Sequence, residues 1–259
     1  MCKKKKMDKN NNEQIKPKKP LGFRFIKGTV KCFYRKFKII GDEFILSEPV
    51  VYIGNHAQMH GPLFAELYFP RDRITWCSGD IMDKSTAPEY IYDDFWPNKN
   101  PKKLKRYKRL AKMIAPLASY IFTNADTIAV HHDQRGIATF KNSVKALEGG
   151  KSVIIFPEWR NAFNHIVNEF QDKFVDLARF YYKKTNKQIK FVPMYIAPKL
   201  KTVCFGEGVI YNPENQIDDE RKRICDYLES EITKLAISLP KHKVVPYANI
   251  KKKLYPYNK

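Results

Sequence analysis

The feature that most constrains the fold is an alternation of short apolar runs with segments of helical periodicity. The runs are rich in β-branched and aromatic residues, which predicts strands, and apolar residues three or four apart between them predict helices. The predicted strands are 50–53, 127–130, 152–156 and 189–196, with a hairpin over 203–210 around Gly206. One predicted helix begins at Gly61-Pro62. Three others are indicated by periodic apolar residues within 137–147, 170–181 and 224–239. This succession predicts a single α/β domain with a largely parallel mixed sheet flanked by helices.

Size and composition exclude several other classes. The chain has 259 residues, which suits one α/β domain, and 43% of them are hydrophobic, which excludes a wholly disordered chain. It has no run of about 18 apolar residues, so we expect no membrane-spanning helix. The lysine-rich N-terminus lacks the apolar segment of a secretory signal, and the five cysteines are scattered. We therefore expect reduced thiols in a cytoplasmic protein.

The charge is strongly positive, because 48 Lys and Arg face 27 Asp and Glu, for a formal net charge of +21. Such a surface attracts polyanions, which include anionic membranes, nucleic acids and phosphorylated substrates. Residues 1–20 carry eight lysines and little apolar content, which predicts a disordered basic tail. The predicted domain covers 21–250, and 251–259 form a basic C-terminal tail.

Two basic segments have the periodicity of amphipathic helices. Within 21–38, apolar and basic residues recur on different faces, which predicts a helix that either continues or runs into a strand near residue 37. Residues 99–112 contain eight Lys or Arg and no acid, and an apolar stripe runs through 104–117. Such helices suit the surface of an anionic membrane. The alternative for 21–38 is that its apolar stripe packs on the domain.

Polar residues gather where three predicted strands end. Asn55 and His56 follow the first strand, 131–135 (His-His-Asp-Gln-Arg) follow the second, and 157–161 (Pro-Glu-Trp-Arg-Asn) follow the third. Ligands of open α/β sheets bind beyond the carboxyl ends of the strands. These three clusters are therefore the candidate site.

These blocks resemble the glycerolipid acyltransferases that include the 1-acylglycerol-3-phosphate acyltransferases. The family pattern is N-H-x4-D, G-x-I-x-V-D-R, F-P-E-G-T-R and V-P-V/I. The matching blocks in order are Asn55-His56, 126–130 (Asp-Thr-Ile-Ala-Val), 156–158 (Phe-Pro-Glu) and 192–195 (Val-Pro-Met-Tyr). Order and spacing match over roughly residues 36–210.

The resemblance implies transfer of a fatty acyl group from acyl-CoA or acyl carrier protein to a lysophospholipid, most simply 1-acylglycerol 3-phosphate. His56 would take the proton of the attacking hydroxyl, since imidazole titrates near neutral pH. His56 and Glu158 are the catalytic candidates, and Glu158 and Arg160 would position the glycerol phosphate. The remaining substrate-binding candidates are Arg135, Asn55, Phe156, Pro157, Val192 and Pro193. No metal and no tightly bound cofactor is expected, and we expect a peripheral protein on the inner face of the cell membrane.

The sequence departs from the family pattern at three places. The arginine of the middle block is replaced by His132, and Arg135 lies three residues further on. The motif aspartate is replaced by Gly61, so a different group must orient the imidazole, with Glu66, Asp133 and Glu158 as candidates. Only Trp159 separates Glu158 from Arg160, which shifts the arginine by one position. His60 is a lesser candidate for the base.

Three other functions stay open on the sequence. A non-catalytic relative would bind lipid without turnover, as Gly61 suggests. A metal-dependent hydrolase would use the histidines at 56, 60, 131, 132 and 165 with Glu158, but the H-E-x-x-H pattern is missing. A nucleic-acid binder fits the charge, yet the sequence carries no recognition motif, so no specific nucleic acid is expected.

Overall fold

The structure is a computed structural model that describes residues 19–96, 100–247 and 258. The predicted tails, 1–20 and 251–259, lie almost entirely outside the described residues. The α-helices are α1 (Leu21–Phe33), α2 (His60–Leu67), α3 (Gly79–Met82), α4 (Ala87–Phe95), α5 (Leu104–Asn124), α6 (Gly136–Glu148), α7 (Asp176–Thr185) and α8 (Ile217–Ser238). The strands are β1 (Lys38–Ile40), β2 (Val51–Gly54), β3 (Arg73–Ser78), β4 (Thr127–Val130), β5 (Ser152–Ile155), β6 (Glu158–Ala162), β7 (Asn168–Phe170), β8 (Lys190–Ala197), β9 (Thr202–Phe205) and β10 (Val209–Ile210). Short 3₁₀ helices occupy Asp42–Phe44, Pro101–Lys103 and Asp172–Val175.

The main sheet is mixed and mostly parallel, as the sequence predicts. Its order is β1-β9-β8-β2-β5-β3-β4, with β10 paired to β8. The pairs β8–β9 and β8–β10 are antiparallel, and the other pairs of the main sheet are parallel. β6 and β7 form a separate antiparallel hairpin. Because β2, β3, β4 and β5 run parallel, their carboxyl ends share one edge and their amino ends share the opposite edge.

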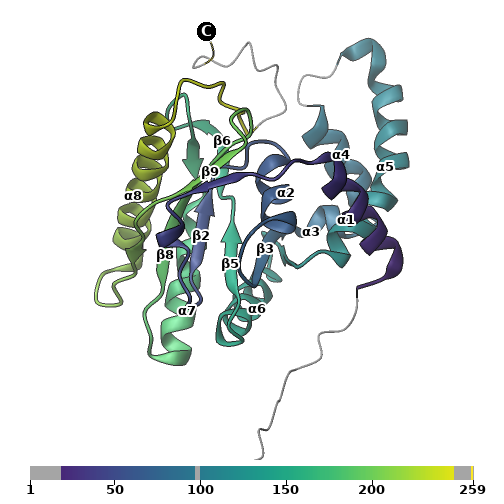
Figure 1. The fold of residues 1–259 in the computed structure, drawn as a ribbon. Helices are drawn as coiled ribbons and strands as arrows, with labels where there is room; N and C mark the ends of the chain where they lie inside the picture. Colours follow the sequence, from purple (N-terminus) through teal and green to yellow (C-terminus); the bar gives the residue numbers. More distant parts are fainter. Residues whose placement is uncertain (1–18, 97–99, 248–257, 259) are drawn as a thin grey trace, which may run out of the picture.

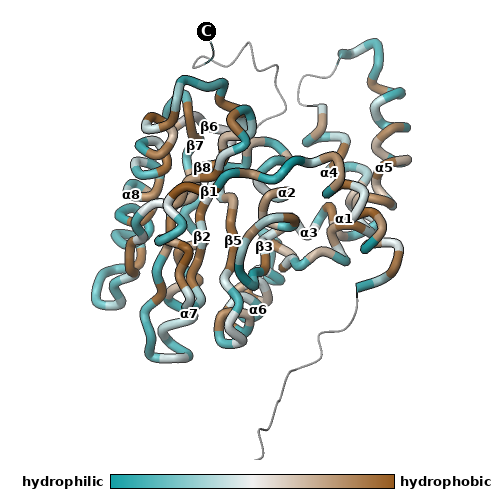
Figure 2. The backbone as a smooth tube through the Cα atoms, in the orientation of Figure 1, coloured by the Kyte–Doolittle hydropathy of each residue, from teal (hydrophilic) through white to brown (hydrophobic). Residues whose placement is uncertain are grey.

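Helices cover both faces of the sheet (Figure 1). The larger core lies between β2, β5 and β8 on one side and α6, α7 and α8 on the other. A second core packs α2 and the segment 34–46 on the opposite face, and a third joins α3, α4 and α5. The central strands are apolar along their length, as their brown tube in Figure 2 shows. Burial on both faces explains these continuous apolar runs.

Most predicted elements are confirmed, and two are corrected. For 21–38 the second alternative is confirmed, because α1 ends at Phe33 and β1 follows, so the segment runs from helix into strand. The predicted hairpin at 203–210 is wrong, because β9 and β10 both pair with β8 rather than with each other. The helix predicted from Phe170 begins only at Asp176, since Phe170 belongs to β7.

One expectation concerns membrane crossing. Within the described residues, no helix is both long and apolar enough to pass through a bilayer.

Candidate active site

The candidate base, His56, lies at the carboxyl edge of the sheet. It follows β2, and the neighbouring strand β5 leads into Phe156, whose ring centroid lies 5.6 Å from that of the imidazole. Tyr247, from the C-terminal segment, packs on the imidazole with a centroid distance of 4.9 Å. The structure therefore brings the N-H and F-P-E blocks together, although they are roughly 100 residues apart in sequence.

A backbone carbonyl orients the imidazole. Nδ1 of His56 lies within hydrogen-bond distance of the carbonyl oxygen of Gln58. Because a carbonyl only accepts, Nδ1 carries the proton and Nε2 of the neutral ring is left with its lone pair. Burial lowers the pKa of His56 to about 4, although the Gln58 carbonyl acts in the opposite direction. The ring is thus neutral at pH 7, as a general base must be.

The loop after His56 holds this carbonyl in place through an unusual backbone. Ala57 and Gln58 have φ values of 46° and 56°, in the left-handed region that residues with a side chain rarely adopt. Each such residue costs about 1 kcal/mol or more. Ala57 is nevertheless fully buried, so packing in the core holds the turn.

The carboxylate of Glu158 binds the backbone at the start of the same loop. Its Oε2 accepts a hydrogen bond from the backbone N–H of His56 at 2.5 Å, and its Oε1 accepts one from the N–H of Asn168 at 3.1 Å. The side chain is buried, and burial raises its pKa to about 7, although both N–H donors lower it. The contacts described for Glu158 reach the backbone of His56 and not the ring, so any effect of Glu158 on the imidazole would act through the backbone.

The structure leaves no space for a side chain at position 61, where the family pattern has an aspartate. Gly61 is buried, and a Cβ built on it would lie 2.8 Å from both the carbonyl oxygen of His56 and the ring of Phe156. Of the proposed substitutes, Glu66 pairs with Lys27 and Arg73, and Asp133 pairs with Arg135. The Gln58 carbonyl therefore contacts Nδ1 of His56 where the sequence predicts a carboxylate.

We expect Gly61→Asp to destabilise the protein rather than to restore a catalytic pair. The new side chain meets backbone and an aromatic ring and carries a charge into a buried position, so the free energy of unfolding should fall by about 3 kcal/mol or more. Urea unfolding measures this loss. Gly28→Asp is the matched control, because a Cβ at Gly28 meets nothing within 4 Å. A stable Gly61→Asp variant with raised activity would contradict this account of the site.

Other predicted residues are placed as follows. Asn55 is buried and bridges β2 to β8 through the carbonyl and N–H of Ile196, at 3.1 and 2.7 Å. Pro193 lies beside Ile53 in the sheet register, and Val192 belongs to the core. The carbonyl of Pro157 accepts a hydrogen bond from Gln171. These residues shape the edge of the sheet, and their contact with substrate stays a prediction.

The structure gives side-chain contacts for one of the two arginine candidates, Arg135. Arg135 is exposed and binds Asp133 through Nε and a terminal nitrogen at 2.8–3.1 Å, so its guanidinium already has a carboxylate partner. Arg160 lies in β6, but its side chain is outside the described part of the structure.

The histidines do not assemble into a metal site in the part of the chain that the structure describes. No three His, Cys, Asp or Glu side chains come together there in a way that could hold an ion. His60 starts α2, and its Nδ1 lies 2.8 Å from the hydroxyl of Tyr34.

Two site residues escaped the sequence analysis. Gln58 contributes only its backbone, and no side-chain pattern signals a carbonyl turned by a positive φ. Tyr247 reaches the site from the other end of the chain, and its neighbours in sequence carry no motif.

Comparison with solved structures finds proteins of similar fold. No protein-family profile matches the sequence, and no curated protein matches it. Among solved structures, the chain is similar to the crystal structure of the 1-acyl-sn-glycerophosphate (LPA) acyltransferase PlsC from Thermotoga maritima, with a TM-score of 0.46 and 13% sequence identity. The match covers 82% of this chain and 79% of that chain. A likeness at this score assigns no roles to residues, so those roles rest on the geometry of the site.

Proposed function

We propose that the protein transfers an acyl group from an acyl thioester to the hydroxyl of a lysophospholipid, most simply 1-acylglycerol 3-phosphate. The observation that carries the proposal is the neutral His56 ring. Its Nδ1 is fixed by the Gln58 carbonyl, and its Nε2 has no hydrogen-bond partner among the described residues. The resemblance of the N-H and F-P-E blocks to acyltransferases supports the same chemistry.

The proposed reaction uses His56 for two successive proton transfers. Nε2 of His56 takes the proton of the acceptor hydroxyl while its oxygen attacks the thioester carbon. The C–S bond then breaks, and the thiolate leaves with the proton that the imidazole returns. Acyl-CoA or acyl carrier protein would supply the thioester, and no tightly bound cofactor takes part.

A direct assay tests the proposal. Purified protein is incubated with labelled acyl-CoA or acyl carrier protein and a panel of lysophospholipids, and the diacyl product is measured together with the released thiol. We expect equal amounts of both products with at least one acceptor. Release of thiol without acyl transfer, or no turnover with any pair, would overturn the proposed activity.

A second candidate is a non-catalytic relative that binds lipid. It is favoured by the packing of the imidazole between Phe156 and Tyr247 and by the absence of a carboxylate contact to the ring among the described residues. This candidate predicts saturable binding of lysophospholipid with no product in the assay.

We further propose that α1 and α5 hold the protein on an anionic membrane. The two helices lie in contact (Figure 1). Both expose large apolar side chains, and both sequences are rich in Lys and Arg. Phe25 of α1 is 77% exposed and Met113 of α5 is 75% exposed. Each apolar side chain buried in lipid contributes about 1.5–3 kcal/mol, and each nearby cation about 1 kcal/mol.

Replacing both apolar side chains should release the protein from vesicles. We expect the double variant Phe25→Ser and Met113→Ser to bind phosphatidylcholine vesicles containing phosphatidylserine at least about 10-fold more weakly. Sedimentation with the vesicles measures the change. Ile237→Ser is the matched control, because Ile237 is 65% exposed on α8, which lies at the opposite side of the sheet (Figure 1). Equal binding by the double variant and the wild type would exclude this surface.

A further inference from the structure

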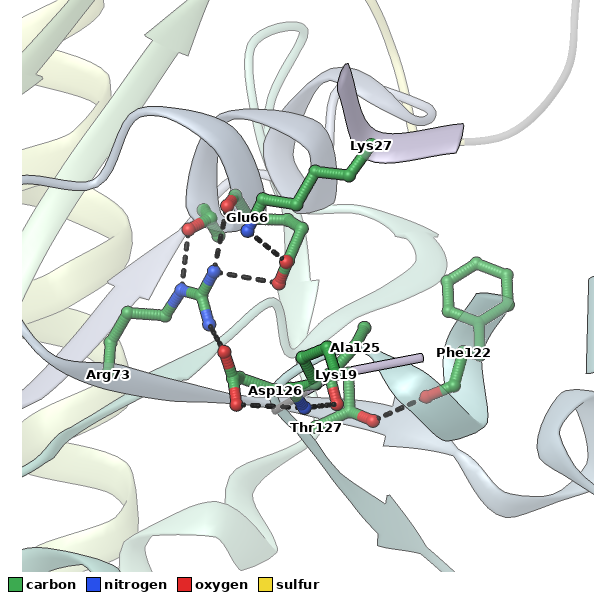
Figure 3. A network of polar contacts seen from close by, with 9 residues as sticks. Lys19, Lys27, Glu66, Arg73, Phe122, Ala125, Asp126 and Thr127 are labelled. Atoms are coloured by element: carbon green, nitrogen blue, oxygen red, sulfur yellow. Dashed lines mark hydrogen bonds and ion pairs between the residues drawn. The ribbon is translucent and has the colours of Figure 1, made fainter. Parts of the chain in front are cut away.

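A basic pocket opens at the amino edge of the sheet, away from His56. Its volume is about 390 Å³. Its lining comes from the start of α1, the end of α2 and the residue before β4: Lys19, Phe23, Arg24, Lys27, Glu66 and Asp126. Arg73, the first residue of β3, pairs with two of the lining residues, Glu66 and Asp126 (Figure 3). His56 follows the carboxyl end of β2, which runs in the same direction as β3, so the pocket and the candidate active site lie at opposite edges.

Both carboxylates of this pocket are shared between cations. Glu66 binds Lys27 at 2.6 Å and Arg73 at 2.7 Å (Figure 3). Asp126 binds Lys19 at 3.1 Å and Arg73 at 3.4 Å. Although burial raises the pKa of Asp126, Lys19, Arg73 and Lys151 lower it below its usual value overall, so Asp126 is charged. Counting Arg24, four cations face two carboxylates, which leaves an excess of two positive charges.

The excess is available to a ligand. Among the described residues, the guanidinium of Arg24 has no hydrogen-bond or ion-pair partner, and it lines the pocket. Lys19 and Lys27 are about one-third exposed at the rim, and each ammonium has donors that its partners do not use. In contrast, Arg73 is almost fully buried, and it pairs with both Glu66 and Asp126.

The start of α1 adds a second source of positive potential. The helix has 13 residues, its N-cap is Pro20, no side chain caps it, and its first turn contains no acidic residue. The amides of the first turn therefore lack partners within the helix, and the helix dipole is positive at this end. Phosphate groups bind where such amides and an arginine meet.

We infer that this pocket binds a phosphate group, carried either by an anionic lipid headgroup or by a molecule free in solution. Arg24 would bind two phosphate oxygens, and Lys19 and Lys27 would neutralise the remaining charge. Leu21 and Phe25, which neighbour lining residues in the sequence of α1, are 78% and 77% exposed, and exposed apolar side chains suit a site for a lipid phosphate. The site is independent of acyl transfer.

Titration with two phosphate sources tests the site on the full chain. In one arm, isothermal titration calorimetry measures the binding of inorganic phosphate at constant ionic strength. In the other, sedimentation measures binding to phosphatidylcholine vesicles with and without phosphatidic acid. The variants are Arg24→Ala and the matched control Arg35→Ala, whose side chain is exposed just after α1 and outside the pocket. Circular dichroism confirms that each variant is folded.

We expect Arg24→Ala to weaken binding by about 10-fold or more, and Arg35→Ala to change it less than about 2-fold. A difference seen with inorganic phosphate assigns the site to phosphate as such. A difference confined to phosphatidic acid vesicles assigns it to a lipid headgroup. Equal losses in both variants would show general charge attraction and would overturn the site, as would unchanged binding in Arg24→Ala. Neither arm depends on catalysis, so a failed acyl-transfer assay leaves this test intact.

Discussion

His56→Ala should lower the rate of acyl transfer by about 10²- to 10⁴-fold, the usual contribution of a positioned general base. The reason is the arrangement of the ring: its Nδ1 is committed to the Gln58 carbonyl, and its Nε2 is the basic atom left for the acceptor hydroxyl. The measurement is kcat/KM with the best donor and acceptor found in the assay. Binding of the lysophospholipid should change little, because removal of the base acts on the transition state.

Two other histidines serve as controls for this experiment. His132→Ala should retain full activity, because His132 is exposed on the loop after β4. His60→Ala tests the neighbouring candidate, whose Nδ1 already contacts the hydroxyl of Tyr34. Loss of activity in His60→Ala with normal activity in His56→Ala would reverse the assignment of the base.

The acidic limb of the pH profile gives an independent signature of His56. Because burial lowers its pKa to about 4, the ring should still be neutral at pH 5.5, where an ordinary histidine is about nine-tenths protonated. We therefore expect the limb of kcat/KM that His56 controls to fall near pH 4 rather than near pH 6.5. A limb near pH 6.5 that persists in Glu158→Gln would show that the ring is solvated in the active enzyme.

The sequence predicts elements well where burial is complete. β2, β5 and β8 are buried on both faces, so their apolar runs are continuous and visible in the sequence. The sequence does not predict β3, because Arg73 and Thr75 interrupt its apolar run; both are buried in the structure, and Arg73 is paired with carboxylates. Local patterns do not report such long-range partners.

The candidate site was predictable in its side chains and not in its backbone. The N-H and F-P-E blocks pointed to His56 and Glu158, and the sheet brings them together. The group that orients the imidazole could not be found, because it depends on positive φ values at Ala57 and Gln58, two residues that do not favour them. The basic pocket at the amino edge was equally hidden, since α1, α2 and the start of β4 meet only in the folded chain.

Glu158→Ala should strongly destabilise the protein. It removes the acceptor of two N–H groups, those of His56 and Asn168, and leaves them without that partner in a buried place. We expect the free energy of unfolding at pH 7 to fall by about 2–5 kcal/mol. Glu169→Ala is the matched control on the neighbouring strand; its side chain is exposed, and a change below about 0.5 kcal/mol is expected.

The pH dependence of the free energy of unfolding reports the ionisation of Glu158. Burial raises the pKa of Glu158 from its ordinary value of 4.5 to about 7, so between these values the folded protein binds a proton that the unfolded chain has lost. The stability that this group contributes is therefore complete below pH 4.5 and falls by about 3 kcal/mol as the pH rises to 7. Glu229, whose pKa is also raised to about 7 by burial, adds a slope of the same sign, and His56 adds one of the opposite sign.

The difference between the wild-type and Glu158→Gln curves isolates Glu158, since the other two groups are common to both proteins. We expect this difference to change by about 3 kcal/mol between pH 4.5 and 7, with no change for Glu169→Gln. Activity gives the readout that a purely structural role would not move. At equal folded fraction, Glu158→Gln should retain more kcat than Glu158→Ala, because its carbonyl oxygen can still accept the N–H of His56. If the two variants have the same kcat once folded, Glu158 stabilises the domain without positioning the base.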